Sequence, residues 1–340
     1  MKFLSCVGFA ALCGCVTAVS EPQFTCTSGL NVAKCPDLSQ PLETPGAKGR
    51  HASVKAWYKK ASAEFQAGKA EKPCILFGDS LTANWRDKDT FNFLSSRFNV
   101  VRDGVCGDQI QHLLWRMIDL KEELIACPPA VALIMIGTNN LREGMTSKDR
   151  YEGVKNLVAT LRSWCPETKI VVFCLPPMGL SWARKVFTQC AETSELYRTL
   201  ADWEHVFYFD FSAHLLNPKT QEVLTDYIVG DCCHFSARGY NEVVGPFYAG
   251  AISLVTNPSV KKEFYVQNEK WYQYLKNRRV FCDHFFLLEE RLKCDSHLNG
   301  IKEYWKQIML KAMDDRKFVP PMPEEYARMV KEEGLPPEVR

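Results

Sequence analysis

Five short apolar runs separated by stretches of helical spacing dominate the middle of the chain. The runs are rich in strand-forming residues and cover residues 74–77, 99–102, 130–136, 169–174 and 206–210. The helical stretches between them cover residues 85–97, 108–125, 147–163 and 184–202. Strands that alternate with helices form βαβ units, whose right-handed crossovers cover both faces of a parallel sheet. The sequence therefore predicts an α/β fold, a flavodoxin-like three-layer α/β/α sandwich with a five-stranded parallel sheet.

Helical segments flank this region on both sides. Residues 51–69 have helical spacing and are expected to pack on the sheet, and residues 236–255 are expected to form the closing helix. One α/β domain is thus predicted over residues 51–257. Residues 258–319 are helical, aromatic and charged, which predicts a C-terminal extension packed on the domain, with a substrate lid or a membrane-facing surface as alternatives. The proline-rich residues 320–340 predict an exposed tail.

The first 20 residues have the pattern of a secretory signal peptide. A basic residue precedes an apolar run at residues 3–19, and small residues lie just before Glu21. The run is short and weakly hydrophobic for a membrane span, so a retained anchor and a lipidated cysteine are weaker alternatives. Cleavage after Ser20 predicts a secreted protein or one in the lumen of the secretory pathway, with an irregular leader at residues 21–50.

Cysteine usage agrees with an oxidising compartment. Three of the 15 cysteines lie in the predicted signal peptide, which leaves an even number. An even count permits a disulfide framework, although the sequence does not fix its connectivity. The best local pairs are Cys26 with Cys35 and Cys282 with Cys294, and these are the predicted bridges.

A Gly-Asp-Ser-Leu segment follows the first predicted strand. Ser80 comes just past the carboxyl end of that strand, which is where open α/β sheets place their ligands. Asp and Ser also favour turns and helix starts, so a turn with an N-cap is the simpler interpretation of this segment taken alone.

Three later segments carry candidate functional residues in comparable places. Gly107 lies in a loop after the second strand, where a glycine allows the backbone to approach a ligand closely. Asn139 follows the third strand within a Gly-Thr-Asn-Asn sequence. Asp231 precedes His234 by three residues, a spacing that projects both side chains from one turn toward the same side.

Together, these four segments resemble the Ser, Gly, Asn and Asp-x-x-His blocks of the SGNH (GDSL) hydrolase family. The resemblance covers about residues 72–255. Within it, residues 107–116 and 137–140 are most similar to the branch that contains the α subunits of platelet-activating-factor acetylhydrolase. A single Gly-Asp-Ser-Leu is a weak signal, whereas four blocks in the same order are a specific one.

The resemblance implies a role for each of these residues in ester hydrolysis. Ser80 would be the nucleophile, His234 the base and Asp231 the residue that orients the base. The backbone N–H groups of Ser80 and Gly107 and the side-chain amide of Asn139 would form the oxyanion hole. The other histidines lack an aspartate three residues earlier in the corresponding block.

The resemblance also implies a small acyl pocket lined by Leu81, Thr138 and Cys233. Leu81 and Thr138 suit a short acyl group, whereas Cys233 replaces a larger aliphatic residue and would widen the pocket. Cys106 is expected to flank the same cleft, which suggests a disulfide from Cys106 to Cys232 or Cys233.

The predicted function is a secreted serine esterase that hydrolyses short-chain, acetyl-like esters through an acyl-enzyme intermediate. A phospholipid or an O-acetylated sugar would be its substrate. No cofactor is needed, and adjacent cysteines suit one tetrahedral ion poorly, so no metal site is predicted. The alternatives are a lipase or lysophospholipase with the C-terminal helices as a lid, and an inactive secreted binding protein. With a net charge of +2, a nucleic-acid partner is not predicted, membrane contact is the less favoured alternative, and the oligomeric state is open.

Overall fold

The computed structural model describes residues 45–85, 88–178, 184–217, 220–285 and 287–322. The predicted signal peptide, most of the predicted leader and most of the predicted tail lie outside the described residues. The predicted Cys26–Cys35 bridge also lies outside them.

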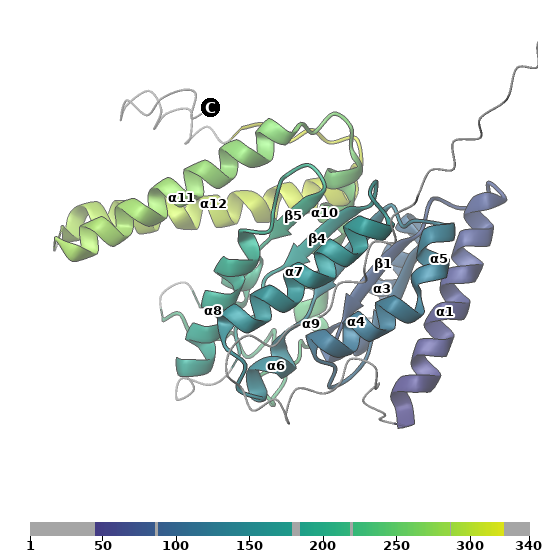
Figure 1. The fold of residues 1–340 in the computed structure, drawn as a ribbon. Coiled ribbons are helices and arrows are strands. Elements are labelled where there is room, and N and C mark those ends of the chain that lie inside the picture. Colours follow the sequence, from purple (N-terminus) through teal and green to yellow (C-terminus); the bar gives the residue numbers. More distant parts are fainter. Residues whose placement is uncertain (1–44, 86–87, 179–183, 218–219, 286, 323–340) are drawn as a thin grey trace, which may run out of the picture.

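A parallel sheet forms the centre of the molecule (Figure 1). In chain order its strands are β1 (Cys74–Gly78), β2 (Val100–Gly104), β3 (Val131–Met135), β4 (Lys169–Phe173) and β5 (Val206–Phe209). The spatial order is β2-β1-β3-β4-β5, and all neighbouring pairs are parallel. All but two of the strand residues are buried, because helices cover both faces and each strand is consequently a continuous apolar run. The predicted fold class is confirmed.

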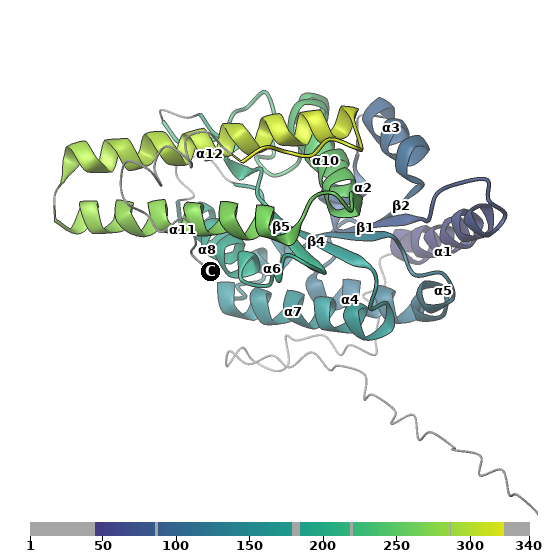
Figure 2. The same cartoon turned by 90° about the horizontal axis from the view of Figure 1, so that it is seen from above.

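Helices form a layer on each face of the sheet (Figure 2). One layer contains α4 (Ile110–Asp119), α5 (Lys121–Ala126), α7 (Ser147–Trp164) and α8 (Arg184–Arg198). The other contains α3 (Lys88–Phe98) and α10 (Gly245–Thr256). At the β2 edge, α1 (Pro45–Gln66) packs beside the sheet. This helix begins inside the segment that the sequence predicted to be an irregular leader.

Three short helical segments lie next to the sequence motifs. Directly after β1 comes α2 (Ser80–Ala83), and α6 (Thr138–Arg142) follows β3. After the Asp231–His234 segment, α9 (Ala237–Gly239) and a π-helical turn, η4 (Tyr240–Val244), lead without interruption into α10.

The C-terminal extension is a helical hairpin that projects beyond the β5 edge (Figures 1 and 2). Its helices, α11 (Lys262–His284) and α12 (Leu288–Asp314), pack on each other, and α12 packs on α10. At the closest approach, a Cβ on Gly250 would lie 2.6 Å from the carbonyl oxygen of Met309, so only a glycine fits there. The predicted helical extension is confirmed. In the described part of the chain, no helix has the length and apolar character needed to cross a membrane.

All ten cysteines in the described residues are free, which corrects two disulfide predictions. Cys282 and Cys294 are buried in the hairpin as thiols, where a free cysteine packs as a small hydrophobe. The thiol of Cys106 instead lies 3.4 Å from the Asn84 side chain, and Cys233 is buried with its sulfur 3.3 Å from that of Met178. Cys106 therefore bridges to neither Cys232 nor Cys233, because the predicted partners face different neighbours.

Candidate active site

The order of the strands brings three of the predicted site residues to one edge of the sheet. Because β1 lies between β2 and β3, the carboxyl ends of these strands are adjacent. Ser80 follows β1, Gly107 follows β2 and Asn139 follows β3. Connections that leave adjacent strand ends in opposite directions open a crevice there, and this is the usual ligand site of doubly wound sheets.

Ser80, His234 and Asp231 form one hydrogen-bonded chain. The Nε2 atom of His234 lies 2.7 Å from the Oγ atom of Ser80, although the two residues are 154 positions apart. On the other side of the ring, Nδ1 lies 2.7 Å from Oδ2 of Asp231. An ionised carboxylate can only accept, so Nδ1 carries the proton and Nε2 is left to accept the hydroxyl proton of Ser80. This arrangement suits removal of a proton from Ser80.

The loop that carries Asp231 and His234 is held by hydrogen bonds from its own backbone N–H groups to the Asp231 side chain. Oδ1 of Asp231 accepts hydrogen bonds from the backbone N–H groups of Cys233, at 3.0 Å, and His234, at 2.9 Å. Cys232 adopts a left-handed conformation with φ of 58°, which tightens the turn. Burial raises the pKa of Asp231, but hydrogen bonds from the backbone and ring of His234 outweigh this and lower it to about 2. The carboxylate thus stays ionised at all ordinary pH values.

The three groups predicted to form an oxyanion hole lie after β1, β2 and β3 and have N–H groups without a partner in the described part of the chain. The Nδ2 atom of Asn139 donates one hydrogen bond to the carbonyl oxygen of Asp108, at 2.8 Å, which leaves its second N–H. Gly107 has φ of 83°, and a Cβ there would meet no atom within 4 Å. Among the described residues, the N–H groups of Ser80 and Gly107 donate to no other group. Each of the three predicted donors therefore has an N–H that is free to bind a ligand oxygen.

Sequence reasoning assigned no role to Arg116, which is buried behind this crevice. Its Nη2 donates to the carbonyl oxygen of Gly78 at 2.9 Å and its Nη1 to that of Asp103 at 3.1 Å. Its Nε donates to the Asp108 carboxylate at 2.8 Å. The guanidinium thus joins the ends of β1 and β2 to the loop that holds Asn139. A charged residue within the apolar helix at 110–117 was the available sequence signal.

Three buried carboxyl groups surround Arg116 and differ in charge. Burial raises the pKa of Asp79 to about 7, and Oδ1 of Asp79 accepts the N–H of Leu81 at 2.9 Å. Burial also raises the pKa of Asp108, to about 6, against the pull of Arg116. For Asp103, burial acts in the same direction but is outweighed by Arg116 and His51, so its pKa is lowered. Asp103 is therefore the ionised partner of Arg116.

The three predicted pocket residues are buried next to the predicted chemical groups. Leu81, Thr138 and Cys233 are each at most 4% exposed and adjoin Ser80, Asn139 and His234 in sequence. Burial raises the pKa of Cys233 to about 11, so its thiol is neutral. Among the described residues, the Thr138 hydroxyl has no hydrogen-bond partner.

Two competing histidines have structural partners elsewhere. Nε2 of His51 lies 3.0 Å from the Asp119 carboxylate. His112 accepts the backbone N–H of Gln109 at 3.0 Å, and burial together with Arg116 lowers its pKa to about 4. In the described residues, no cluster of three His, Cys, Asp or Glu side chains could hold a metal ion.

Comparison with known proteins gives consistent matches. A model of the GDSL-like lipase/acylhydrolase family matches residues 76–241. The chain is 26% identical over 190 residues to platelet-activating factor acetylhydrolase IB subunit alpha1 of Bos taurus, covering 55% of this chain and 79% of the relative. The same subunit of Pongo abelii is 31% identical over 189 residues, with 55% and 79% covered. A solved structure of a GDSL-like lipase from Bacteroides thetaiotaomicron VPI-5482 is 18% identical, with a TM-score of 0.44, and covers 58% of this chain and 98% of that one.

Proposed function

Because the chain belongs to the GDSL-like lipase/acylhydrolase family and is an ester-cleaving hydrolase, we propose that it is a serine esterase with Ser80 as its nucleophile. The observation that carries this proposal is the pair of 2.7 Å contacts linking Ser80, His234 and Asp231. A second support is that Ser80, Gly107 and Asn139 each have one N–H without a partner among the described residues.

The proposed reaction proceeds through an acyl-enzyme intermediate. His234 takes the proton of Ser80 as Oγ attacks the ester carbonyl carbon, and Asp231 stabilises the resulting imidazolium. The negative charge on the carbonyl oxygen is stabilised by the N–H donors of Ser80, Gly107 and Asn139. His234 then protonates the departing alcohol. Water attacks the acyl carbon while His234 takes its proton, and His234 returns the proton to Oγ of Ser80 as the carboxylic acid leaves.

We further propose that the acyl group is short, as in an acetyl ester. Leu81, Thr138 and Cys233 are buried and adjoin the proposed catalytic residues in sequence, and the sulfur of Cys233 lies 3.3 Å from that of Met178, which supports a confined acyl site. The names of the matched relatives describe acetylhydrolases, which agrees with this size. The alcohol portion of the substrate would be a phospholipid or a sugar.

The test is to replace Ser80 with alanine and measure hydrolysis of p-nitrophenyl acetate. We expect turnover to fall by about 10⁴- to 10⁶-fold with the fold unchanged, because the substitution removes only one hydroxyl oxygen. Ser96→Ala, at an exposed position on α3, is the matched control. Hydrolysis by Ser80→Ala at the rate of the control would refute the mechanism.

A second candidate function, a lipase or lysophospholipase acting at a lipid surface, draws on one observation. The far end of the hairpin carries six apolar side chains that are 43–64% exposed: Val280, Phe281, Phe285, Leu287, Leu288 and Leu292. Exposed apolar groups of this kind suit contact with lipid. Comparing p-nitrophenyl acetate with the octanoate separates the candidates, because a short-acyl pocket loses most of its rate on octanoate.

We also propose that the protein is exported, on the basis of the signal-like first 20 residues. Mass spectrometry of the mature N-terminus in the source organism tests this proposal. A chain that starts after Ser20 would support it, and an intact Met1 would contradict it.

A further inference from the structure

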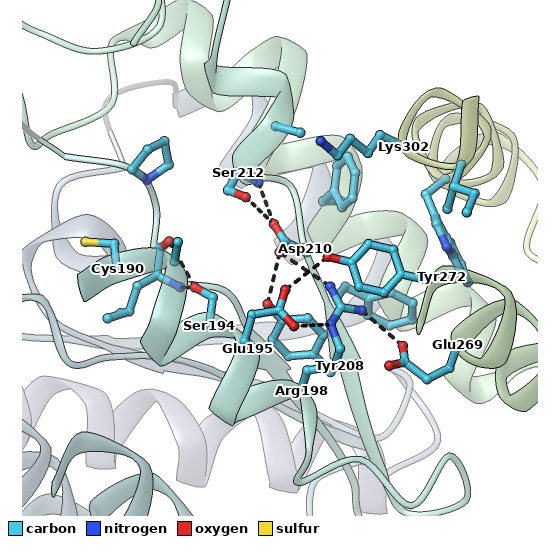
Figure 3. A pocket seen from close by; sticks show the side chains of 18 of the residues that line it. Cys190, Ser194, Glu195, Arg198, Tyr208, Asp210, Ser212, Glu269, Tyr272 and Lys302 are labelled. Atoms are coloured by element: carbon cyan, nitrogen blue, oxygen red, sulfur yellow. Dashed lines mark hydrogen bonds and ion pairs between the residues drawn. The ribbon is translucent and has the colours of Figure 1, made fainter. Parts of the chain in front are cut away.

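A cavity of about 200 Å³ lies between the α/β domain and the C-terminal hairpin (Figure 3). Its walls come from α8, from the residues at the end of β5, and from both α11 and α12. Ser80, Asp231 and His234 do not line it. The cavity is thus distinct from the candidate active site, and the hairpin completes it.

Four of the five charged side chains that line this cavity take part in ion pairs, and the fifth, Lys302, forms none among the described residues. Arg198 lies over the rings of Tyr208 and Tyr272, with 4.6 and 4.1 Å to their centroids. Its guanidinium pairs with Glu269 at 3.0 Å and with Asp210 at 3.6 Å, as Figure 3 shows. Because burying a charge without a new partner is unfavourable, the paired groups around Arg198 favour an uncharged ligand on their side of the cavity.

Two buried polar atoms that line the cavity have no partner in the described part of the chain. They are the hydroxyl of Tyr265 and Oδ1 of Asn268, both on side chains that are 2% exposed. The amide nitrogen of Asn268 is engaged, because it donates to the carbonyl oxygen of Phe264 at 2.7 Å. The two residues are three positions apart on α11 and so lie on one helix face. A buried polar group without a partner is rare, and both atoms are available to bond a molecule that enters the cavity.

The remaining walls of the cavity are largely aromatic. Phe209 and Trp305 meet edge to face at a centroid distance of 5.6 Å, and Phe247 and Trp203 also line the space. Aromatic walls with a few polar groups are typical of small-molecule sites, and they favour a flat ring as ligand.

We propose that this cavity binds a small uncharged molecule that combines an aromatic ring with a hydroxyl group. One ligand hydroxyl satisfies both free atoms, because it donates to Oδ1 of Asn268 and accepts from the hydroxyl of Tyr265. The ring then packs among Phe209, Phe247 and Trp305.

The test is isothermal titration calorimetry on the full chain with three matched probes: benzyl alcohol, benzoate and benzylammonium. These share the ring and differ in charge. We expect binding of benzyl alcohol alone, and a loss of about 5- to 10-fold in affinity in Tyr265→Phe, which removes one hydrogen-bonding hydroxyl.

Blocking the entrance is the second arm of this test. Ala191 lines the cavity and is exposed on α8, so Ala191→Trp should abolish binding without disturbing the core. Ala63→Trp, at an exposed position on α1, is the matched control and should bind normally. The proposal would be overturned if benzyl alcohol failed to bind, or if Ala191→Trp bound it as tightly as the unmodified protein does. Tighter binding of either charged probe than of benzyl alcohol would also overturn it.

Discussion

Asn139 shows how a single side chain is prepared for its proposed role. Its hydrogen bond to the Asp108 carbonyl oxygen fixes the amide plane and leaves one N–H for the oxyanion. Asn139→Ala should therefore lower kcat by about 100- to 1000-fold with little change in KM, because the donor acts mainly in the transition state. Ester hydrolysis assays check this, with exposed Asn92→Ala as the control. A change confined to KM would contradict the role.

Asp79 gives the protein a predictable pH dependence of stability. Its pKa is near 7 when folded and near 3.8 when unfolded, so between these values the unfolded state binds fewer protons and stability falls as pH rises. This loss is on the order of 4 kcal/mol by pH 7.

Asp79→Asn keeps the acceptor for Leu81 N–H and cannot ionise. We expect urea unfolding to show similar stability for both proteins at pH 4 and a more stable variant at pH 8. Parallel stability curves for the variant and the parent across this range would show that Asp79 does not titrate as described.

The residues found from the sequence and those missed differ in one physical respect. Ser80, Gly107, Asn139, Asp231 and His234 belong to short local motifs at strand ends, so a resemblance could identify them. Arg116 acts through partners that are distant in sequence, and the raised pKa of Asp79 comes from its burial, neither of which a local pattern reveals. The predicted bridges of Cys282 with Cys294 and of Cys106 with Cys232 or Cys233 were wrong, because sequence spacing does not show whether two thiols are oxidised.

At the level of elements, Arg116 on α4 connects the ends of β1 and β2 to Asp108, whose carbonyl oxygen accepts a hydrogen bond from Asn139. A lysine in its place keeps the charge but cannot reach three acceptors in different directions. Arg116→Lys should lower kcat by about 10- to 100-fold with a smaller effect on KM, because the Asn139 donor shifts.

Steady-state kinetics and the unfolding midpoint of Arg116→Lys should be measured together, with exposed Arg238→Lys as the control. A loss of stability with unchanged kcat would show that Arg116 is only a structural residue.

The elements themselves were largely predictable, since strand and helix periods differ clearly. All five strands lie where the apolar runs predicted them. The predicted helix at 108–125 is instead divided at Leu120 into α4 and α5. The pairing of α11 with α12 was not predicted, because their apolar residues alone do not specify which faces meet.

At the scale of the whole molecule, the hairpin and the α/β domain meet at Gly250 and Met309. At an exposed helix position, alanine normally makes a protein more stable than glycine does. At position 250, however, the Cβ of alanine would lie 2.6 Å from a carbonyl oxygen. Gly250→Ala should therefore destabilise the protein by about 1–3 kcal/mol through overpacking.

Denaturant unfolding measures this change, and p-nitrophenyl acetate hydrolysis by the folded fraction should stay constant because α10 and α12 do not carry the proposed catalytic residues. Increased stability of Gly250→Ala would mean that the two helices do not pack as described.

The central claim is that Ser80 becomes acylated by an ester substrate. Rapid acid quenching of the reaction with p-nitrophenyl acetate, followed by peptide mass spectrometry, tests this directly. We predict a mass increase of one acetyl group on the peptide containing Ser80, and its absence in Ser80→Ala. Full turnover with an unmodified Ser80 peptide, or acetyl transfer to a different residue on the productive pathway, would contradict the account.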